Sequence, residues 1–255
     1  MTRRGVWLLG ASLGNFLFLY LPIAVLVVFS FNDSRFSAVW QGFSLRWYRA
    51  LASDDALMAA LQNSLIVGVC ATAMATVLGV SAAVCMERLA VRGKRLIEGA
   101  LVLPLVIPEI MMGVALMLFF VLIKFPLGLA TITIGHIAMN VPVVMIIIRA
   151  RLRKLDPGLE EAARDLGATP WQAFSRVTLP LLVPAILGAV LMAFTISLDD
   201  FIVAFFTAGP GSTTLPLRVY SMVKSSVSPA INALSAVLVA VSMVLISISL
   251  RLQRT

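Results

Sequence analysis

Charged residues are scarce in this chain of 255 residues. Asp, Glu, Lys and Arg make up 13% of it, whereas a soluble domain usually carries about 25%. Hydrophobic residues account for 60%. This composition excludes an ordinary soluble domain and predicts an all-α polytopic membrane protein. Although the net charge is +8, the basic residues fall in short runs between apolar segments, which disfavours nucleic-acid binding.

Cysteine and histidine are almost absent, with two cysteines and one histidine. Cys70 and Cys85 lie in one apolar segment and His136 lies in another, so neither a disulfide framework nor a four-ligand metal site is predicted. We interpret His136 as a hydrogen-bonded packing residue. The sequence contains no Gly-x4-Gly-Lys-Ser/Thr motif, so any ATP must be bound by a partner chain. We predict no catalytic residue and no cofactor bound by this chain.

Long apolar runs fill most of the sequence. A run of roughly 18 residues or more can cross about 30 Å of hydrocarbon. The start, Met-Thr-Arg-Arg, is similar to a twin-arginine export signal, but the apolar run that follows is too long and lacks a cleavage site. A first transmembrane helix is therefore favoured. The six predicted transmembrane segments are residues 5–31, 61–86, 96–123, 131–148, 181–206 and 230–250.

Basic residues are distributed unevenly between the two sides of the membrane. The chain ends and residues 87–95 and 149–180 hold 14 of the 20 Lys and Arg residues. Because basic loops stay cytoplasmic, both ends and the 149–180 loop are predicted to face the cytoplasm. The chain itself is predicted to lie in the inner membrane. We divide the chain into a first helix with its external loop (1–60), a core that contains the 149–180 loop (61–250) and a tail (251–255).

The longest polar interruption, residues 155–180, carries signals for two short helices. Asp156 can cap a first helix that begins at the following proline, and Gly167 can end that helix in the left-handed conformation. Thr169 can cap a second helix, with Gln172 completing a capping box. A short rigid helix of this kind is suited to docking into another protein, and a solvated loop helix is the alternative.

Three acidic residues fall within the predicted transmembrane segments. Glu109 lies in the middle of the third segment, and Asp199 and Asp200 lie in the outer half of the fifth. A charge at membrane depth costs roughly 3 kcal/mol, so it usually faces a cavity or a partner. We predict a cation path, with a position at the helix end as the alternative for the Asp pair. Pro104 and Pro108 predict either a kink or a break in the third segment.

The 149–180 loop also contains a spaced motif. It reads Glu161-Ala162-Ala163, three residues, Gly167, nine residues and Val177-Thr178-Leu179-Pro180, which resembles the EAA motif of ABC importer permeases, E-A-A-x3-G-x9-I-x-L-P. Val177 for Ile is a conservative departure. The resemblance implies a type I ABC importer transmembrane domain, in which this motif docks into the ATPase. The coupling residues that it implies are Glu160, Glu161, Ala162, Ala163, Asp165, Leu166, Gly167, Val177, Leu179 and Pro180.

Further segments look like the spermidine/putrescine permeases of the same family. They include Ser-Leu-Asp-Asp-Phe, Thr-Leu-Pro-Leu and Tyr-Ser-Met-Val-Lys in the C-terminal third, and Asn-Asp-Ser-Arg-Phe and Arg-Trp-Tyr near the start. The resemblance implies a permease subunit for polyamines, with Glu109, Asp199 and Asp200 along the substrate path. It also implies a second homologous permease subunit, two ATPase subunits that use ATP and Mg²⁺, and an extracytoplasmic solute-binding protein.

Other classes fit the sequence less well. An intramembrane aspartyl protease would need Asp199 and Asp200 to face each other, but adjacent residues on a helix point about 100° apart. A cation transporter driven by an ion gradient would be expected to show inverted repeats, and no internal repeat is evident. An ABC permease for another small solute is the alternative within the family.

Overall fold

The computed structural model describes residues 3–34, 39–88, 92–225 and 229–252. Helices and one isolated bridge between Asn32 and Phe43 make up the secondary structure of these residues. Residues 253–255 of the predicted tail and part of the predicted 87–95 loop lie outside them. The chain divides into two compact units.

The first unit consists of Met1–Met58 and Arg218–Thr255. Its helices are α1 (Arg3–Phe29), α2 (Arg46–Ala52) and α12 (Pro229–Leu252). Helix α12 packs against both α1 and α2. The two ends of the sequence therefore fold together, although more than half of the chain lies between them.

A buried asparagine organises the loop between α1 and α2. The Asn32 side chain is fully buried, and its amide donates to the Val39 carbonyl at 2.7 Å while its oxygen accepts the Gln41 N–H at 2.8 Å. The Asn32 carbonyl accepts the indole N–H of Trp47 at 2.9 Å. These bonds fold the predicted external loop back onto the end of the first helix.

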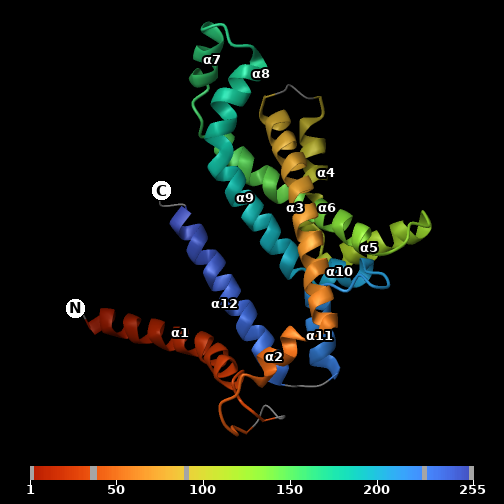
Figure 1. Cartoon of the computed structure of the whole chain (residues 1–255). Helices are drawn as coiled ribbons and strands as arrows, with labels where there is room; N and C mark the ends of the chain where they lie inside the picture. The colour runs from red at the N-terminus through yellow and green to blue at the C-terminus, as the bar shows by residue number, and fades with distance from the viewer. Residues whose placement is uncertain (1–2, 35–38, 89–91, 226–228, 253–255) are drawn as a thin grey trace. The chain divides into compact units, whose positions relative to one another are not determined.

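The second unit, Ala59–Leu217, holds the remaining helices. Helix α3 (Asp55–Arg88) leads into it and α11 (Leu215–Ser225) leads out of it. Figure 1 shows α7 and α8 together at one end of this unit. Between α3 and α11 lie α4 (Lys94–Val106), α5 (Glu109–Leu122), α6 (Leu129–Leu152), α7 (Gly158–Asp165), α8 (Pro170–Ala173), the π-helix η1 (Phe174–Thr178), α9 (Leu179–Asp199) and α10 (Ile202–Thr207).

Helix α6 forms the centre of the second unit. It packs against α4, α9 and α10, and it buries Ile132, Val144, Met145 and Ile148 completely. Helix α3 approaches it closely at Gly79, where a Cβ atom would lie 2.6 Å from the Cβ of Val144. Small residues allow membrane helices to approach one another in this way. The close contact sets the position of α6, which carries several of the polar residues of the site.

Four helices are long and apolar enough to cross a membrane, or five if one bent pair counts as a single span. The four are α1, α3, α6 and the continuous helix Pro170–Asp199, and the bent pair is α4 with α5. In α12 the part whose side chains are described without a gap, Pro229–Val241, is an apolar helix too short to be counted as a span. This count covers the described residues alone. The all-α polytopic architecture is confirmed, and six spans stay a prediction.

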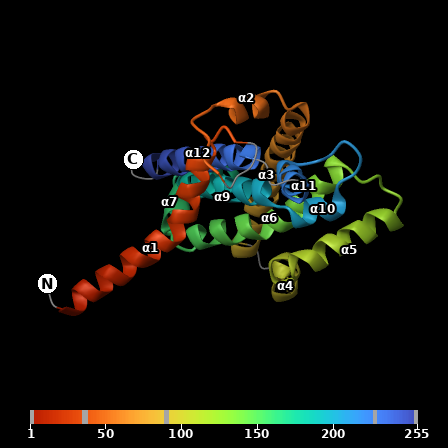
Figure 2. The same cartoon turned by 90° about the horizontal axis from the view of Figure 1, so that it is seen from below.

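The third predicted segment, residues 96–123, consists of two helices. Helix α4 ends at Val106 and α5 begins at Glu109, with a bend of 106° between them. Pro108 explains the break, because proline drives the preceding residue out of the helical region, and Ile107 has φ −70° and ψ 134°. Of the kink and the break that the sequence allowed, the structure has the break (Figure 2). Glu109, predicted in the middle of this segment, lies directly after the break as the first residue of α5.

The fifth predicted segment, residues 181–206, also has different bounds. Its helix starts earlier and spans Pro170–Asp199, and α10 follows after a break at Asp200. The stretch between the fifth and sixth predicted segments, residues 207–229, for which no helix is predicted, contains α11. Pro216 suits the first turn of that helix, where its missing N–H leaves no bond unmade.

Gly79→Ala is expected to destabilise the protein, because the new methyl group would meet Val144 at 2.6 Å and the Val141 carbonyl at 3.0 Å. Gly188→Ala in α9 is the matched control, since its Cβ would meet nothing within 4 Å. Both changes gain about 1 kcal/mol of helix propensity, so their difference isolates the clash. In detergent, the free energy of unfolding of Gly79→Ala should fall about 1–3 kcal/mol below that of the control. Equal values would contradict this packing.

Candidate functional site

The polar loop between α6 and α9 begins with the helix that the sequence predicts. The Asp156 carboxylate accepts the Gly158 N–H at 2.9 Å, and α7 starts there, one residue later than predicted. Gly167 follows the helix with φ +89°, in the left-handed region that glycine enters without steric cost. The predicted start and stop signals are confirmed, and they fix both ends of α7.

The second predicted helix is not a separate short helix. It begins as predicted, because the Thr169 hydroxyl accepts the Gln172 N–H at 3.3 Å and the Gln172 side chain accepts the Thr169 N–H at 2.9 Å. Pro170 occupies its first position. It then continues through η1 into α9, as one helix of 30 residues. The end of the 149–180 loop is therefore joined directly, without a break, to a membrane span.

Figure 1 places α7 at one end of the second unit. Exposed residues of α7 and its flanking turns form a surface there, here called the coupling surface. Leu166 is 91% exposed and Trp171 is 71% exposed, although both are large and apolar. Sequence reasoning missed Trp171 and Leu159, and a large apolar residue in a polar loop was the signal that would have found them. The coupling surface comprises Leu159, Glu161, Ala162, Asp165, Leu166, Gly167 and Trp171.

The other predicted coupling residues lie behind this surface or along the helix that follows it. Ala163, Val177 and Leu179 are half-buried, and Pro180 is exposed at the start of α9. Glu160 is also half-buried, and its carboxylate is engaged by other parts of the chain. Glu160 therefore contacts the rest of the chain, whereas the next residue, Glu161, is exposed.

Arg88, the last residue of α3, connects α7 with the π-helical turn. Its guanidinium forms an ion pair with Glu160 and donates to the Thr178 hydroxyl at 3.2 Å. The Thr178 hydroxyl donates in turn to the Glu160 carboxylate. The guanidinium also lies 5.8 Å from the centre of the Phe174 ring. Three separate segments of the second unit thus meet at one arginine.

Glu87, the residue before it, connects α3 with α6. Its carboxylate accepts hydrogen bonds from Arg149 at 2.7 Å and from Arg153 at 2.9 Å. Arg149 is only 8% exposed, and it also donates to Glu98 of α4 at 2.6 Å. A planar guanidinium can serve two carboxylates at once, which a lysine could not do with the same geometry. Glu87 therefore binds α6, whose Arg149 also binds α4, and the next residue, Arg88, binds α7.

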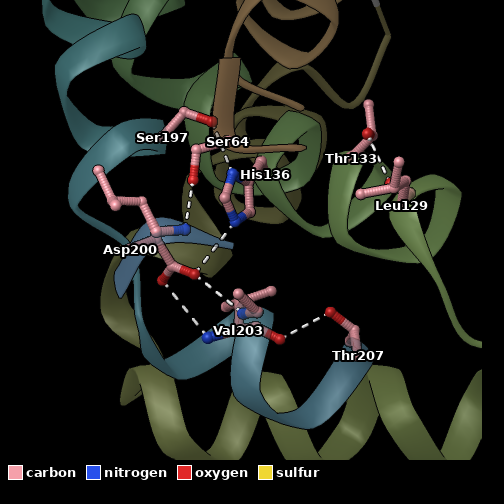
Figure 3. A network of polar contacts seen from close by, with 10 residues as sticks. Ser64, Leu129, Thr133, His136, Ser197, Asp200, Val203 and Thr207 are labelled. Atoms are coloured by element: carbon pink, nitrogen blue, oxygen red, sulfur yellow. Dashed lines mark hydrogen bonds and ion pairs between the residues drawn. The ribbon is translucent and has the colours of Figure 1, made fainter. Parts of the chain in front are cut away.

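His136 forms a buried network where α6 meets the break between α9 and α10 (Figure 3). Its Nδ1 lies 2.6 Å from the Ser197 hydroxyl, and its Nε2 lies 3.0 Å from the Asp200 carboxylate. That carboxylate also accepts the N–H groups of Val203 at 3.4 Å and Ala204 at 2.9 Å. The prediction that His136 is a hydrogen-bonded packing residue is confirmed.

The three predicted acids of the substrate path differ in exposure. The Asp200 side chain is 4% exposed and is occupied by His136 and the first turn of α10. Asp199 and Glu109 are exposed on the second unit. The two aspartates are therefore in different environments, which is not the arrangement of a facing catalytic dyad. As substrate contacts, all three stay predictions.

The chain belongs to the family described as "Binding-protein-dependent transport system inner membrane component", whose model matches residues 75–255. It is therefore a multi-pass inner-membrane component of a transport system. It is 43% identical over 242 residues to the putrescine transport system permease protein PotI of Escherichia coli (strain K12), covering 92% of this chain and 86% of that protein. It is 39% identical over 226 residues to the spermidine/putrescine transport system permease protein PotC of the same strain, with coverage of 89% and 86%. These relatives are permease proteins, which agrees with the prediction of a transport subunit.

Solved structures of ABC transporters have the same fold. A chain of a bacterial ABC transporter involved in the import of the acidic polysaccharide alginate superposes with a TM-score of 0.79 at 18% identity, covering 98% of each chain. The structure of a bacterial alginate transporter with a periplasmic protein bound to an alginate pentasaccharide gives 0.72 at 16% identity, with coverage of 96% and 93%. At such low identity the likeness establishes the fold alone, and it confirms the ABC importer fold that the motif implied.

Asp200→Asn and Asp199→Asn should differ in their effect on stability. Asp200→Asn removes a buried charge that His136 and two backbone N–H groups share, so the free energy of unfolding should fall by about 1–3 kcal/mol. Asp199→Asn changes an exposed side chain and should stay within about 0.5 kcal/mol of the parent. Equilibrium unfolding in detergent measures both values. A parental stability for Asp200→Asn would show that the network contributes nothing.

The ion pair of Arg88 with Glu160 predicts a pH dependence of α7. Burial raises the pKa of Glu160, but the Thr178 hydroxyl and the Arg88 guanidinium outweigh it and hold the pKa below its usual value of 4.5. Because the folded protein has the lower pKa, this stabilisation is complete above pH 4.5 and is lost as the pH falls through the folded pKa. Hydrogen-exchange protection of the α7 amides should therefore decrease below pH 4.5. Glu160→Gln should show protection slightly below that of the parent and no such transition. A parent in which the protection of the α7 amides does not change with pH would refute the assignment.

Proposed function

We propose that this chain is the permease subunit of an ATP-driven polyamine importer, and that it forms part of the path for putrescine or spermidine. The observation that carries the proposal is the EAA-type motif on the exposed helix α7, in a chain 43% identical to a putrescine permease protein. The motif supports the coupling to ATP hydrolysis, and the relatives support the solute.

The coupling surface is the part that we assign to the ATPase. Its apolar members Leu166 and Trp171 would lose contact with water on docking, and burying a large apolar side chain contributes about 1.5–3 kcal/mol. Glu161 would supply a polar contact beside them. ATP and Mg²⁺ would be bound by the partner, since this sequence has no phosphate-binding loop. The basic residues of the 149–180 loop support a cytoplasmic position for α7 and for both chain ends.

The exposed acids are the part that we assign to the solute. Glu109 begins α5 directly after the break at Pro108, and Asp199 ends α9 directly before the break at Asp200. Carboxylates attract a polyamine by charge and by charge-assisted hydrogen bonds. Asp200 is different, because its buried carboxylate is already shared by His136 and α10. We therefore assign it to the positioning of the break and the exposed acids to the solute.

The complete transporter would contain four kinds of chain. Besides this permease we propose a second homologous permease, two ATPase subunits and an extracytoplasmic solute-binding protein. The family is named for its dependence on a binding protein, and an alginate transporter of the same fold has been captured with its loaded periplasmic protein. These observations support the binding protein. The subunit numbers follow from the family resemblance of the motif.

The transporter can be tested by purification and uptake. Affinity purification of the chain from its native membrane under mild conditions should bring down an ATPase subunit. Proteoliposomes of that complex, given the binding protein, should take up radiolabelled putrescine only when ATP is present on the side of α7. If no ATPase co-purifies, or if uptake follows a proton gradient without ATP, the chain is not an ABC importer permease.

Glu109→Gln and Asp199→Asn test the path for the solute. Each removes one exposed carboxylate, so putrescine uptake should fall by about 10- to 100-fold, as loss of a charged hydrogen bond of roughly 1.5–3 kcal/mol implies. Asp55→Asn, an exposed acid at the start of α3, is the control and should retain parental uptake. Co-purification with the ATPase should be unchanged in all three. Parental uptake in both path variants would remove these acids from the path.

A further inference from the structure

We propose that Arg88 is a positioning residue that transmits the movement of α7 to the membrane helices, by holding Glu160 of α7 and both ends of the π-helical turn to the end of α3. The inference rests on the proposed function, because it takes α7 as the helix that the ATPase moves. The polypeptide already connects α7 through the π-helical turn to α9. The contacts of Arg88 would give the movement of α7 a second path, through side chains, to α3.

Helix α7 needs such a contact because it is too short to hold its own position. It has eight residues, and isolated helices shorter than about 12 residues are marginal in water. Its largest apolar neighbours, Leu159 and Leu166, are exposed and do not anchor it to the unit. Glu160 is half-buried and carries the charge that faces the rest of the unit, and Arg88 and Thr178 hold it there.

The π-helical turn is the second part of the argument. A single turn of π-helix inside an α-helix is a local irregularity that frequently marks functional sites. Here it lies between the capped start of the helix at Thr169 and the membrane span α9. Arg88 contacts its first residue, Phe174, through the ring and its last residue, Thr178, through the hydroxyl. A change in the winding of this turn would therefore move both contacts of the arginine.

The contacts continue from Arg88 into the core of the unit. Glu87 lies next to it in the same helical turn and binds Arg149, which binds Glu98 as well. Displacement of the α3 end by Arg88 would act on this nearly buried arginine and hence on α6 and α4. Helix α4 leads into the break before Glu109, the exposed acid of the proposed path. The chain of contacts thus runs from the coupling surface to the helices that carry the solute.

The test compares transport with ATP consumption in reconstituted complexes of the full-length chain. Arg88→Gln, Glu160→Gln and their double variant form a cycle, and exposed Arg92→Gln in the same loop is the control. The measured quantity is radiolabelled putrescine taken up per ATP hydrolysed, for complexes that contain the ATPase in parental amounts. A purely structural ion pair at a partly exposed site would alter stability slightly and leave this ratio unchanged.

Each single variant is expected to lower uptake per ATP on the order of 2- to 30-fold, the range that residues in coupling networks produce. The double variant should fall no further than the singles, because both remove the same contact. Thr178→Val deletes the hydroxyl between the two charges and should also lower the uptake per ATP. It takes the place of either single variant if that variant does not assemble with the ATPase. A parental ratio in the variants, or effects that multiply in the double variant, would overturn the role of Arg88. A parent complex without ATP-dependent uptake would instead overturn the proposed function.

Discussion

A chain inside a bilayer must satisfy its own backbone hydrogen bonds, and this constraint governs where the helices of the second unit can break. At the break after α9, Asp200 accepts two N–H groups at the start of α10. At the other end of α10, the Thr131 hydroxyl donates to the Thr207 carbonyl at 2.7 Å. Both ends of a six-residue helix are thereby bonded to side chains. His136 shares the negative charge that this arrangement brings into the protein interior.

The ion pairs at the end of the second unit that carries α7 follow a different rule, because water reaches part of them. The Arg88 and Glu160 side chains are 33% and 22% exposed, so their attraction is screened and adds little stability. Arg149, by contrast, is nearly buried, and removal of one of its carboxylates would leave a charge with fewer partners. The same end of the unit therefore combines a firm junction of α3, α4 and α6 with a weaker contact to α7. A weak contact can be remade during a transport cycle, whereas a firm one keeps the helices in register.

Local chemistry made much of the fold predictable. The Asp156 and Thr169 caps, the Gly167 turn and the effect of Pro108 each depend on a few neighbouring residues, and sequence reasoning reached them or named the right alternatives. The contacts of Arg88 were out of reach, because its partner Glu160 lies 72 residues away in the sequence. Apolar periodicity also cannot reveal that α9 ends at Asp199, because the segments before and after the two aspartates are both apolar.

Both breaks place an acid beside a helix start, which explains how the second unit accommodates carboxylates among apolar residues. Glu109 is the first residue of α5, and the Asp200 carboxylate binds the first turn of α10. The positive end of the helix dipole stabilises a nearby negative charge by about 0.3–1 kcal/mol, and by more in partly buried sites. Glu109 is exposed, whereas the Asp200 carboxylate is enclosed by His136 and α10, so the two acids share a position beside a helix start and differ in what surrounds them.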